Sequence, residues 1–159
     1  MRLRAWSLGS GSSGNSFLVQ GGRTTVLLDA GFPARTVREK VRQAGVDPGA
    51  VEAVFLTHEH GDHAGGAGVV ARSLGCPVIG NAGTLVAARN SIGNAPTQAT
   101  TSGETVELGD LVVTSFRTSH DAVEPVGYVF RHGDRRMVYA TDTGVLTPAL
   151  LAAMAGAHL

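Results

Sequence analysis

A short apolar run, residues 53–57, leads directly into four side chains that can bind a metal ion. They are His58, His60, Asp62 and His63, all within six positions of the chain. The apolar run is typical of a buried strand, and the loop after a strand is where functional side chains are usually displayed. Imidazole nitrogens and carboxylate oxygens suit zinc, manganese or iron. The pattern H-x-H-x-D-H therefore predicts a metal site, and four unrelated surface residues are a much poorer explanation.

The spacing within this motif favours two metal ions over one. His58 and His60 are two positions apart, so in an extended loop their side chains point the same way. Asp62 and His63 are adjacent and can diverge, which suits a second centre beside the first.

Two later residues, His120 and Asp142, can complete the site. His120 follows the predicted strand 111–116, and Asp142 follows the predicted strand 137–141. Taken alone, the first could be a surface histidine and the second a turn carboxylate. Both stand where a strand ends, as His58 does, so one rim can gather all three. A carboxylate has two oxygens, so Asp142 is the natural bridge between cations about 3.5–4 Å apart.

Strands and helices alternate along the 159 residues, which predicts one layered α/β domain. Further strands are expected at residues 3–8, 16–20, 24–28, 77–80, 105–108 and 128–131, and helices at 34–44, 65–74, 84–89 and 148–154. Residues 90–102 are polar, with Gly93, Pro96 and several threonines, and are predicted to form a loop that could cover a substrate.

Composition excludes several classes of protein. Thirteen Lys and Arg balance thirteen Asp and Glu, which argues against a strongly basic nucleic-acid coat and against an acidic tail. The single cysteine, Cys76, forms no intrachain disulfide, is expected in the core, and fits a reducing compartment. The sequence has no apolar run of about 18 residues and no long apolar segment near its start. We therefore expect a cytoplasmic protein that does not associate with membranes.

A loop rich in glycine and serine, residues 9–16, lies between two predicted strands. Such a loop can bring backbone N–H groups close to an anion, although the lysine of a Walker loop is missing. An ordinary flexible hairpin is the alternative. Within the loop, Asn15 is predicted to bind substrate. Asp29, at the end of the strand 24–28, is expected to orient a metal-binding histidine or to shape the turn, not to bind the metal itself.

Five segments together resemble a known family: residues 7–16, 27–31 (Leu-Leu-Asp-Ala-Gly), 57–63, 119–121 (Ser-His-Asp) and 140–144 (Ala-Thr-Asp-Thr-Gly). They are similar to the metallo-β-lactamase fold superfamily and, within it, to the WalJ (YycJ) group of bacterial cytoplasmic exonucleases that act on double-stranded DNA. The resemblance runs along essentially the whole chain.

The resemblance implies a metallo-β-lactamase αββα sandwich with two divalent ions, zinc or manganese, with iron as an alternative. It places the first ion on His58, His60 and His120. It places the second on Asp62 and His63, with Asp142 bridging the two, and gives Asp62 a catalytic role as well. The family pattern continues beyond the last predicted helix to a further histidine ligand. Residues 1–159 are therefore expected to be the N-terminal part of one such domain, truncated at its C-terminus and short of one second-site ligand.

The expected reaction is hydrolysis of phosphodiester bonds, with DNA as the nucleic acid substrate. Two cations polarise phosphoryl oxygens and lower the pKa of a water, while Asp62 orients that water or shuttles its proton. A small-molecule hydrolase acting on a thioester, lactone or β-lactam is one alternative, because the metal site alone does not exclude it. An inactive, truncated metal-binding fragment is the other. Redox members of the superfamily are disfavoured, because they carry Glu where this chain has His60.

Overall fold

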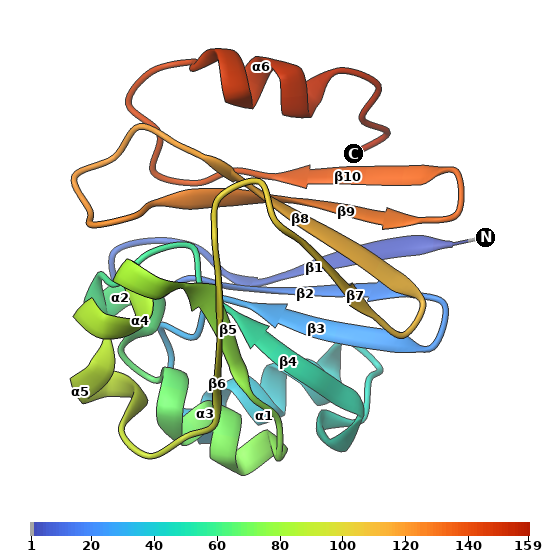
Figure 1. The fold of residues 1–159 in the computed structure, drawn as a ribbon. Helices are drawn as coiled ribbons and strands as arrows, with labels where there is room; N and C mark the ends of the chain where they lie inside the picture. Colours follow the sequence, from blue (N-terminus) through green and yellow to red (C-terminus); the bar gives the residue numbers. More distant parts are fainter. Residues whose placement is uncertain (1) are drawn as a thin grey trace.

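The computed structural model describes residues 2–159 as two β-sheets packed face to face between helices (Figure 1). The first sheet has six strands in sequence order: β1 (Leu3–Gly9), β2 (Ser16–Gly21), β3 (Thr24–Leu28), β4 (Val51–Phe55), β5 (Val78–Asn81) and β6 (Thr97–Thr100). The second sheet has four strands in the spatial order β10 (Arg135–Tyr139), β9 (Val126–His132), β8 (Leu111–Arg117) and β7 (Thr105–Leu108).

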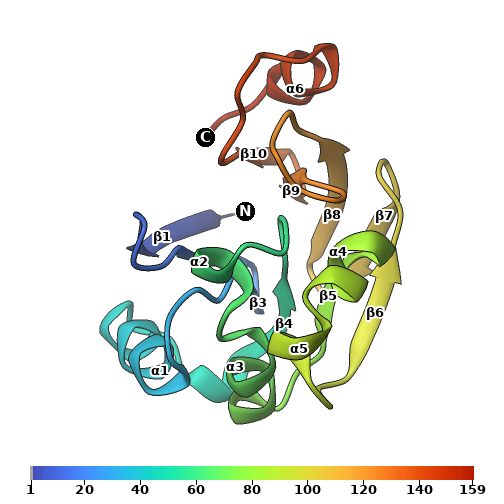
Figure 2. The same ribbon diagram turned by 90° about the vertical axis from the view of Figure 1, so that its left-hand side faces the viewer.

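Helices cover the outer face of each sheet, which makes four layers (Figures 1 and 2). The first sheet carries α1 (Ala34–Gln43), α2 (Gly61–Ala64), α3 (Ala67–Leu74), α4 (Ala82–Ala87), α5 (Arg89–Ile92) and a 3₁₀ turn at Pro48–Ala50. The second sheet carries α6 (Pro148–Met154), which is capped by Thr147, whose hydroxyl oxygen accepts a hydrogen bond from the backbone N–H of Leu150. These layers confirm the predicted αββα sandwich.

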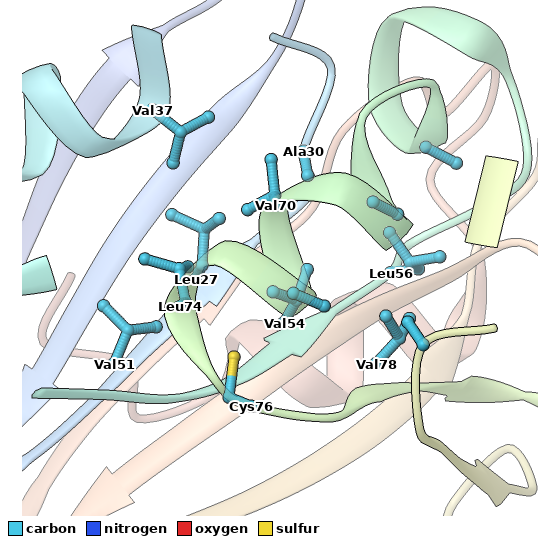
Figure 3. Close-up of a cluster of buried hydrophobic side chains, with 14 of the residues drawn as sticks. Leu27, Ala30, Val37, Val51, Val54, Leu56, Val70, Leu74, Cys76 and Val78 are labelled. Carbon is cyan, nitrogen blue, oxygen red and sulfur yellow. The ribbon is translucent and has the colours of Figure 1, made fainter. Parts of the chain in front are cut away.

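The apolar strands alternate between two hydrophobic cores. Along β3, Leu27 points toward the helices, while Val26 and Leu28 point toward the second sheet. Figure 3 shows the helix-side core, where Leu27 lies near Val70 of α3 and Val37 of α1. Because β3 is buried on both faces, all five of its residues are buried, and its last three, Val26 to Leu28, are apolar without the alternation of a half-exposed strand.

Cys76 is buried in the helix-side core, as expected. No helix within residues 2–159 combines the length and the hydropathy needed to cross a membrane.

Strand direction brings distant parts of the chain to one end of the sandwich. Strands β3 to β6 run parallel, so the carboxyl ends of β3 and β4 lie side by side. The ends of β8 and β10 reach the same side, at the left of Figure 1 and facing the viewer in Figure 2. In parallel α/β sheets, the carboxyl ends of the strands are where ligands bind.

The predicted loop at residues 90–102 is wrong. Its start belongs to α5, and Thr97–Thr100 forms β6, which pairs in parallel with β5 and is the edge of the first sheet. Pairing satisfies backbone groups that β5 would otherwise leave free. Three of the four β6 side chains are exposed, so no apolar alternation signals the strand. Residues 97–100 are therefore part of the sheet, and the segment 90–102 is not one continuous loop.

The predicted helix 65–74 also differs from the structure. Helical turns begin earlier, at Gly61, and are interrupted at Gly65 and Gly66 before α3 starts. The Gly66 backbone N–H donates to the carbonyl oxygen of Ala30 at 2.8 Å, and a Cβ on Gly66 would overlap the carbonyl oxygen of Phe32. The glycine thus allows the loop after β3 to lie against this helical region.

Two glycines near this end of the sandwich provide a matched test of backbone packing. A Cβ on Gly31 would overlap the backbone oxygen of Asp62, whereas a Cβ on Gly61 would meet no atom within 4 Å. We expect Gly31→Ala to lower the free energy of unfolding by about 1–3 kcal/mol, because overpacking forces the backbone to shift. Gly61→Ala should leave stability equal or slightly higher. Urea unfolding of both variants checks this, and equal losses would contradict it.

Candidate metal centre

Three segments bring the six predicted ligands together at this end of the sandwich. The loop after β4, continuing into α2, carries His58, His60, Asp62 and His63. His120 lies in the connection between β8 and β9, and Asp142 follows β10. The ligands therefore come from both sheets.

The first group consists of three histidines. One ring nitrogen from each of His58, His60 and His120 lies within 4.8 Å of the others, and His120 Nε2 is 3.2 Å from His60 Nδ1. Three imidazoles that converge in this way match a catalytic zinc site, which keeps its fourth position open. His58 Nε2 is buried without a hydrogen-bond partner among the described residues. A buried polar atom of this kind is rare without a water or an ion, so the group fits a divalent ion.

The second group shares His58 with the first. His58, His63 and Asp142 offer ligand atoms within 4.8 Å of one another. Asp142 Oδ2 lies 2.7 Å from His63 Nε2 and 3.9 Å from His58 Nε2, so its carboxylate faces both groups. Asp62 Oδ2 is 3.6 Å from His63 Nε2. The backbone of Asp142 has φ +49°, a conformation that is costly without glycine and is concentrated at functional sites.

One buried carboxylate, that of Asp29, orients a histidine in each of the two ligand groups through hydrogen bonds. Asp29 is completely buried, and its Oδ2 lies 2.8 Å from His63 Nδ1. The Thr57 hydroxyl donates to the same oxygen at 2.8 Å and lies 2.9 Å from His58 Nδ1. Because that hydroxyl hydrogen is used on Asp29, the His58 Nδ1–H donates to Thr57, which leaves the His58 Nε2 lone pair for a metal.

Asp29 thus has the orienting position expected from the sequence. Thr57 was missed as a functional residue. The signal that could have revealed it is its place, a hydroxyl residue between the apolar strand and the first histidine.

Burial and charge shift the pKa values of His58, which both groups share, and of His63 in opposite directions. Burial, followed by the neighbouring His63, His120 and His60, lowers the pKa of His58 to about 3, which keeps it neutral and ready to bind metal. Burial also acts to lower the pKa of His63. The hydrogen bond and charge of Asp29, with Asp142 and Asp62, outweigh burial and raise that pKa above its ordinary value.

The side chain of Asn15, which is predicted to bind substrate, is buried and bonded to other residues of the protein. Its side-chain N–H₂ group donates to the carbonyl oxygen of Gly11 at 3.0 Å and to Asp62 Oδ2 at 3.1 Å. Its side-chain oxygen accepts from the Gly11 backbone N–H at 3.0 Å. Asn15 therefore closes the glycine loop and touches Asp62, while direct contact with a substrate stays a prediction.

The hydroxyl of Thr57 can be tested by a near-isosteric change. Thr57→Val removes the link between Asp29 and His58, so we expect zinc affinity to fall about 10–100-fold. Thr57→Ser keeps the hydroxyl and should bind zinc nearly as well as the parent chain. Competition with a chromophoric chelator measures both affinities. A Val variant that binds as tightly as the parent would contradict this role.

Metal uptake should release a proton from His63. Its raised pKa means that the metal-free protein holds a proton on His63 to higher pH than an ordinary histidine does, and a ligand histidine must lose that proton. Affinity should therefore rise as pH rises through the pKa of His63. Calorimetric titration with zinc, in buffers of different ionisation enthalpy, should show proton release that decreases as pH rises and is smaller in His63→Ala. Heats independent of the buffer would contradict the assignment.

Comparison with known proteins agrees with this geometry. A family model described as the metallo-β-lactamase superfamily matches residues 9–151. An exodeoxyribonuclease YycJ from Bacillus anthracis is 36% identical over 161 residues, covering 99% of this chain and 61% of the relative. An exodeoxyribonuclease WalJ from Streptococcus pneumoniae is 36% identical over 145 residues, covering 88% of this chain and 54% of the relative. The chain thus spans between half and two thirds of the length of these relatives.

Solved structures show the same fold at lower identity. The Rm3 metallo-β-lactamase aligns with a TM-score of 0.73 and 18% identity, covering 96% of this chain and 67% of the other. A B3 metallo-β-lactamase with an active-site glutamic acid aligns with a TM-score of 0.70 and 20% identity, covering 96% of this chain and 68% of the other. Since the family model matches most of the sequence and its neighbours share the sandwich, this chain belongs to the metallo-β-lactamase superfamily.

Proposed function

We propose that this protein is a metal-dependent hydrolase that cleaves phosphodiester bonds of DNA as an exonuclease. The observation that carries the proposal is the pair of ligand groups that share His58 and are both faced by the Asp142 carboxylate. Two such groups side by side suit a dinuclear centre, an arrangement that phosphodiester hydrolysis uses to stabilise both the attacking and the leaving oxygen.

Each residue has a proposed role in holding the centre. His58, His60 and His120 would hold one divalent ion, and Asp62 and His63 the other, with Asp142 between them. When bound, the ions supply Lewis acidity and a water of lowered pKa.

Asp62 is proposed as the catalytic carboxylate. Its Oδ2 is held by the Asn15 amide at 3.1 Å and faces His63 Nε2 at 3.6 Å. From there it can orient the attacking water and accept its proton. The ions would be zinc or manganese, with iron as the alternative.

The choice of DNA as substrate rests on the relatives. Those at 36% identity are named exodeoxyribonucleases, whereas the β-lactamases resemble this chain at 16–24% identity and share the fold alone. The formal net charge of zero is compatible with a phosphate substrate, because bound cations provide local attraction at the site. We also propose that residues 1–159 belong to one metallo-β-lactamase-like domain of a cytoplasmic protein.

End-labelled linear double-stranded DNA tests this function directly. With manganese or zinc the protein should release nucleotides, and a chelator should stop the reaction. Asp62→Asn should lower kcat about 10²–10⁴-fold, which is the usual contribution of a positioned acid or base. His132→Ala is the matched control, since His132 contacts the backbone oxygen of Arg2 at 3.1 Å and belongs to neither ligand group.

Other substrates distinguish the competing functions. Intact DNA together with hydrolysis of a thioester, lactone or β-lactam would identify a small-molecule hydrolase. Tight metal binding with no hydrolysis of any of these substrates would identify an inactive metal-binding chain.

A further inference from the structure

Glu59 lies between the first two histidines of the motif and has no role in the proposed ligand set. Its Oε1 accepts a hydrogen bond from the backbone N–H of Val123 at 2.9 Å, across 64 positions of sequence. Val123 belongs to the connection 118–125, which also carries His120. Glu59 therefore ties the loop of the first two ligands to the loop of the third.

The connection 118–125 has little apolar packing of its own. Val123 is 59% exposed, so its side chain does not anchor the loop. The base of the loop is closed by the Thr118 N–H, which donates to the carbonyl oxygen of Pro125 at 3.1 Å. Beyond the base, the Gly144 N–H donates to the Ser119 carbonyl oxygen at 2.7 Å. Two carboxylates also hold the loop: Glu59 at Val123, and Glu124, whose Oε2 accepts from the Gly83 N–H at the start of α4 at 2.7 Å.

A tight turn transmits the position of Val123 to His120. The Ala122 N–H donates to the carbonyl oxygen of His120 at 3.0 Å, so His120, Ala122 and Val123 belong to one short, bonded turn. Fixing the Val123 amide consequently limits where the His120 ring can lie. That ring must stay near His60, whose Nδ1 is 3.2 Å from His120 Nε2.

The second carboxylate oxygen of Glu59 argues against a purely stabilising role. Oε2 is buried and has no hydrogen-bond partner among the described residues. A buried polar atom without a partner costs free energy and calls for an explanation. An apolar residue at position 59 would avoid that cost but would leave the Val123 amide without its acceptor.

We propose that Glu59 is a positioning residue that holds the His120 loop against the first ligand loop through its hydrogen bond to the Val123 amide. The proposal rests on the metal centre of the proposed function but does not depend on the substrate. It predicts that Glu59 controls how well His120 binds an ion at the group formed with His58 and His60.

Cobalt binding by three variants tests the proposal, because cobalt(II) reports its own coordination in visible absorption. Glu59→Ala should weaken cobalt binding at the histidine group about 10-fold, a typical loss when a supporting partner of a ligand is removed. Its absorption band should also change in intensity, as expected for a displaced His120. Glu59→Gln keeps an oxygen acceptor and should restore both affinity and spectrum. Asp121→Ala, which removes an exposed carboxylate from the same loop, should resemble the parent chain.

Amide hydrogen exchange gives a second measurement that needs no metal. In the metal-free protein, the Val123 amide should exchange faster in Glu59→Ala than in Glu59→Gln, because only the latter keeps an acceptor for it. Thermal unfolding of the Ala variant checks that the sandwich is intact. If the Ala variant does not fold, two other results test the proposal: Glu59→Gln should keep the cobalt affinity and spectrum of the parent chain, and the Val123 amide of the parent chain should be protected from exchange.

Two results would overturn the proposal. Parent-like cobalt affinity and spectrum in Glu59→Ala would remove any role for the side chain. Equal weakening in the Ala and Gln variants would assign the effect to negative charge and not to the hydrogen bond. Since these measurements use neither DNA nor turnover, a failure of the exonuclease proposal leaves them interpretable.

Discussion

The metal centre depends on one buried carboxylate at the point where two parallel strands end together. β3 and β4 pair in register, with Leu28 opposite Phe55, and the Asp29 N–H continues the ladder by donating to the Phe55 carbonyl oxygen at 2.8 Å. At Asp29 the backbone turns to φ +56°, which is unfavourable for a residue other than glycine. The bonds from Thr57 and His63 compensate for that conformation and for the burial of the charge.

Hydrogen bonds that begin at the buried Asp29 carboxylate fix the orientation of the ligands nearest to it. Asp29 orients His63 directly and orients His58 through the Thr57 hydroxyl, so one group fixes a ligand in each of the two ligand groups. The outer residues are held by neighbours of their own, Asp62 by the Asn15 amide and the His120 loop by Glu59. Ligand geometry is consequently set by several hydrogen bonds that start from the sheet, and not by the loops alone.

The sequence predicted the site best where the residues present have few roles other than metal binding. Four metal-capable side chains in H-x-H-x-D-H predict a site by themselves, and the apolar run before them predicts the strand that displays it. β6 was not predicted because three of its four residues, Thr97, Gln98 and Ala99, are exposed, so this edge strand has no apolar alternation. The roles of Thr57 and Glu59 were not predicted, because each depends on a partner far along the chain. Thr57 contacts Asp29 and Glu59 contacts Val123, and only the three-dimensional fold brings these pairs together.

The origin of the ligands in both sheets has a consequence for how the protein folds. His58 and His63 follow a strand of the first sheet, whereas His120 and Asp142 follow strands of the second, so neither sheet alone assembles the centre. These contacts join residues 60 or more positions apart, such as His60 with His120 and His63 with Asp142, and contacts of such long range form slowly. An ion that binds only the assembled centre would shift the folding equilibrium toward the folded state by mass action. Because its ligands come from both sheets, the bound ion would also oppose separation of the two sheets.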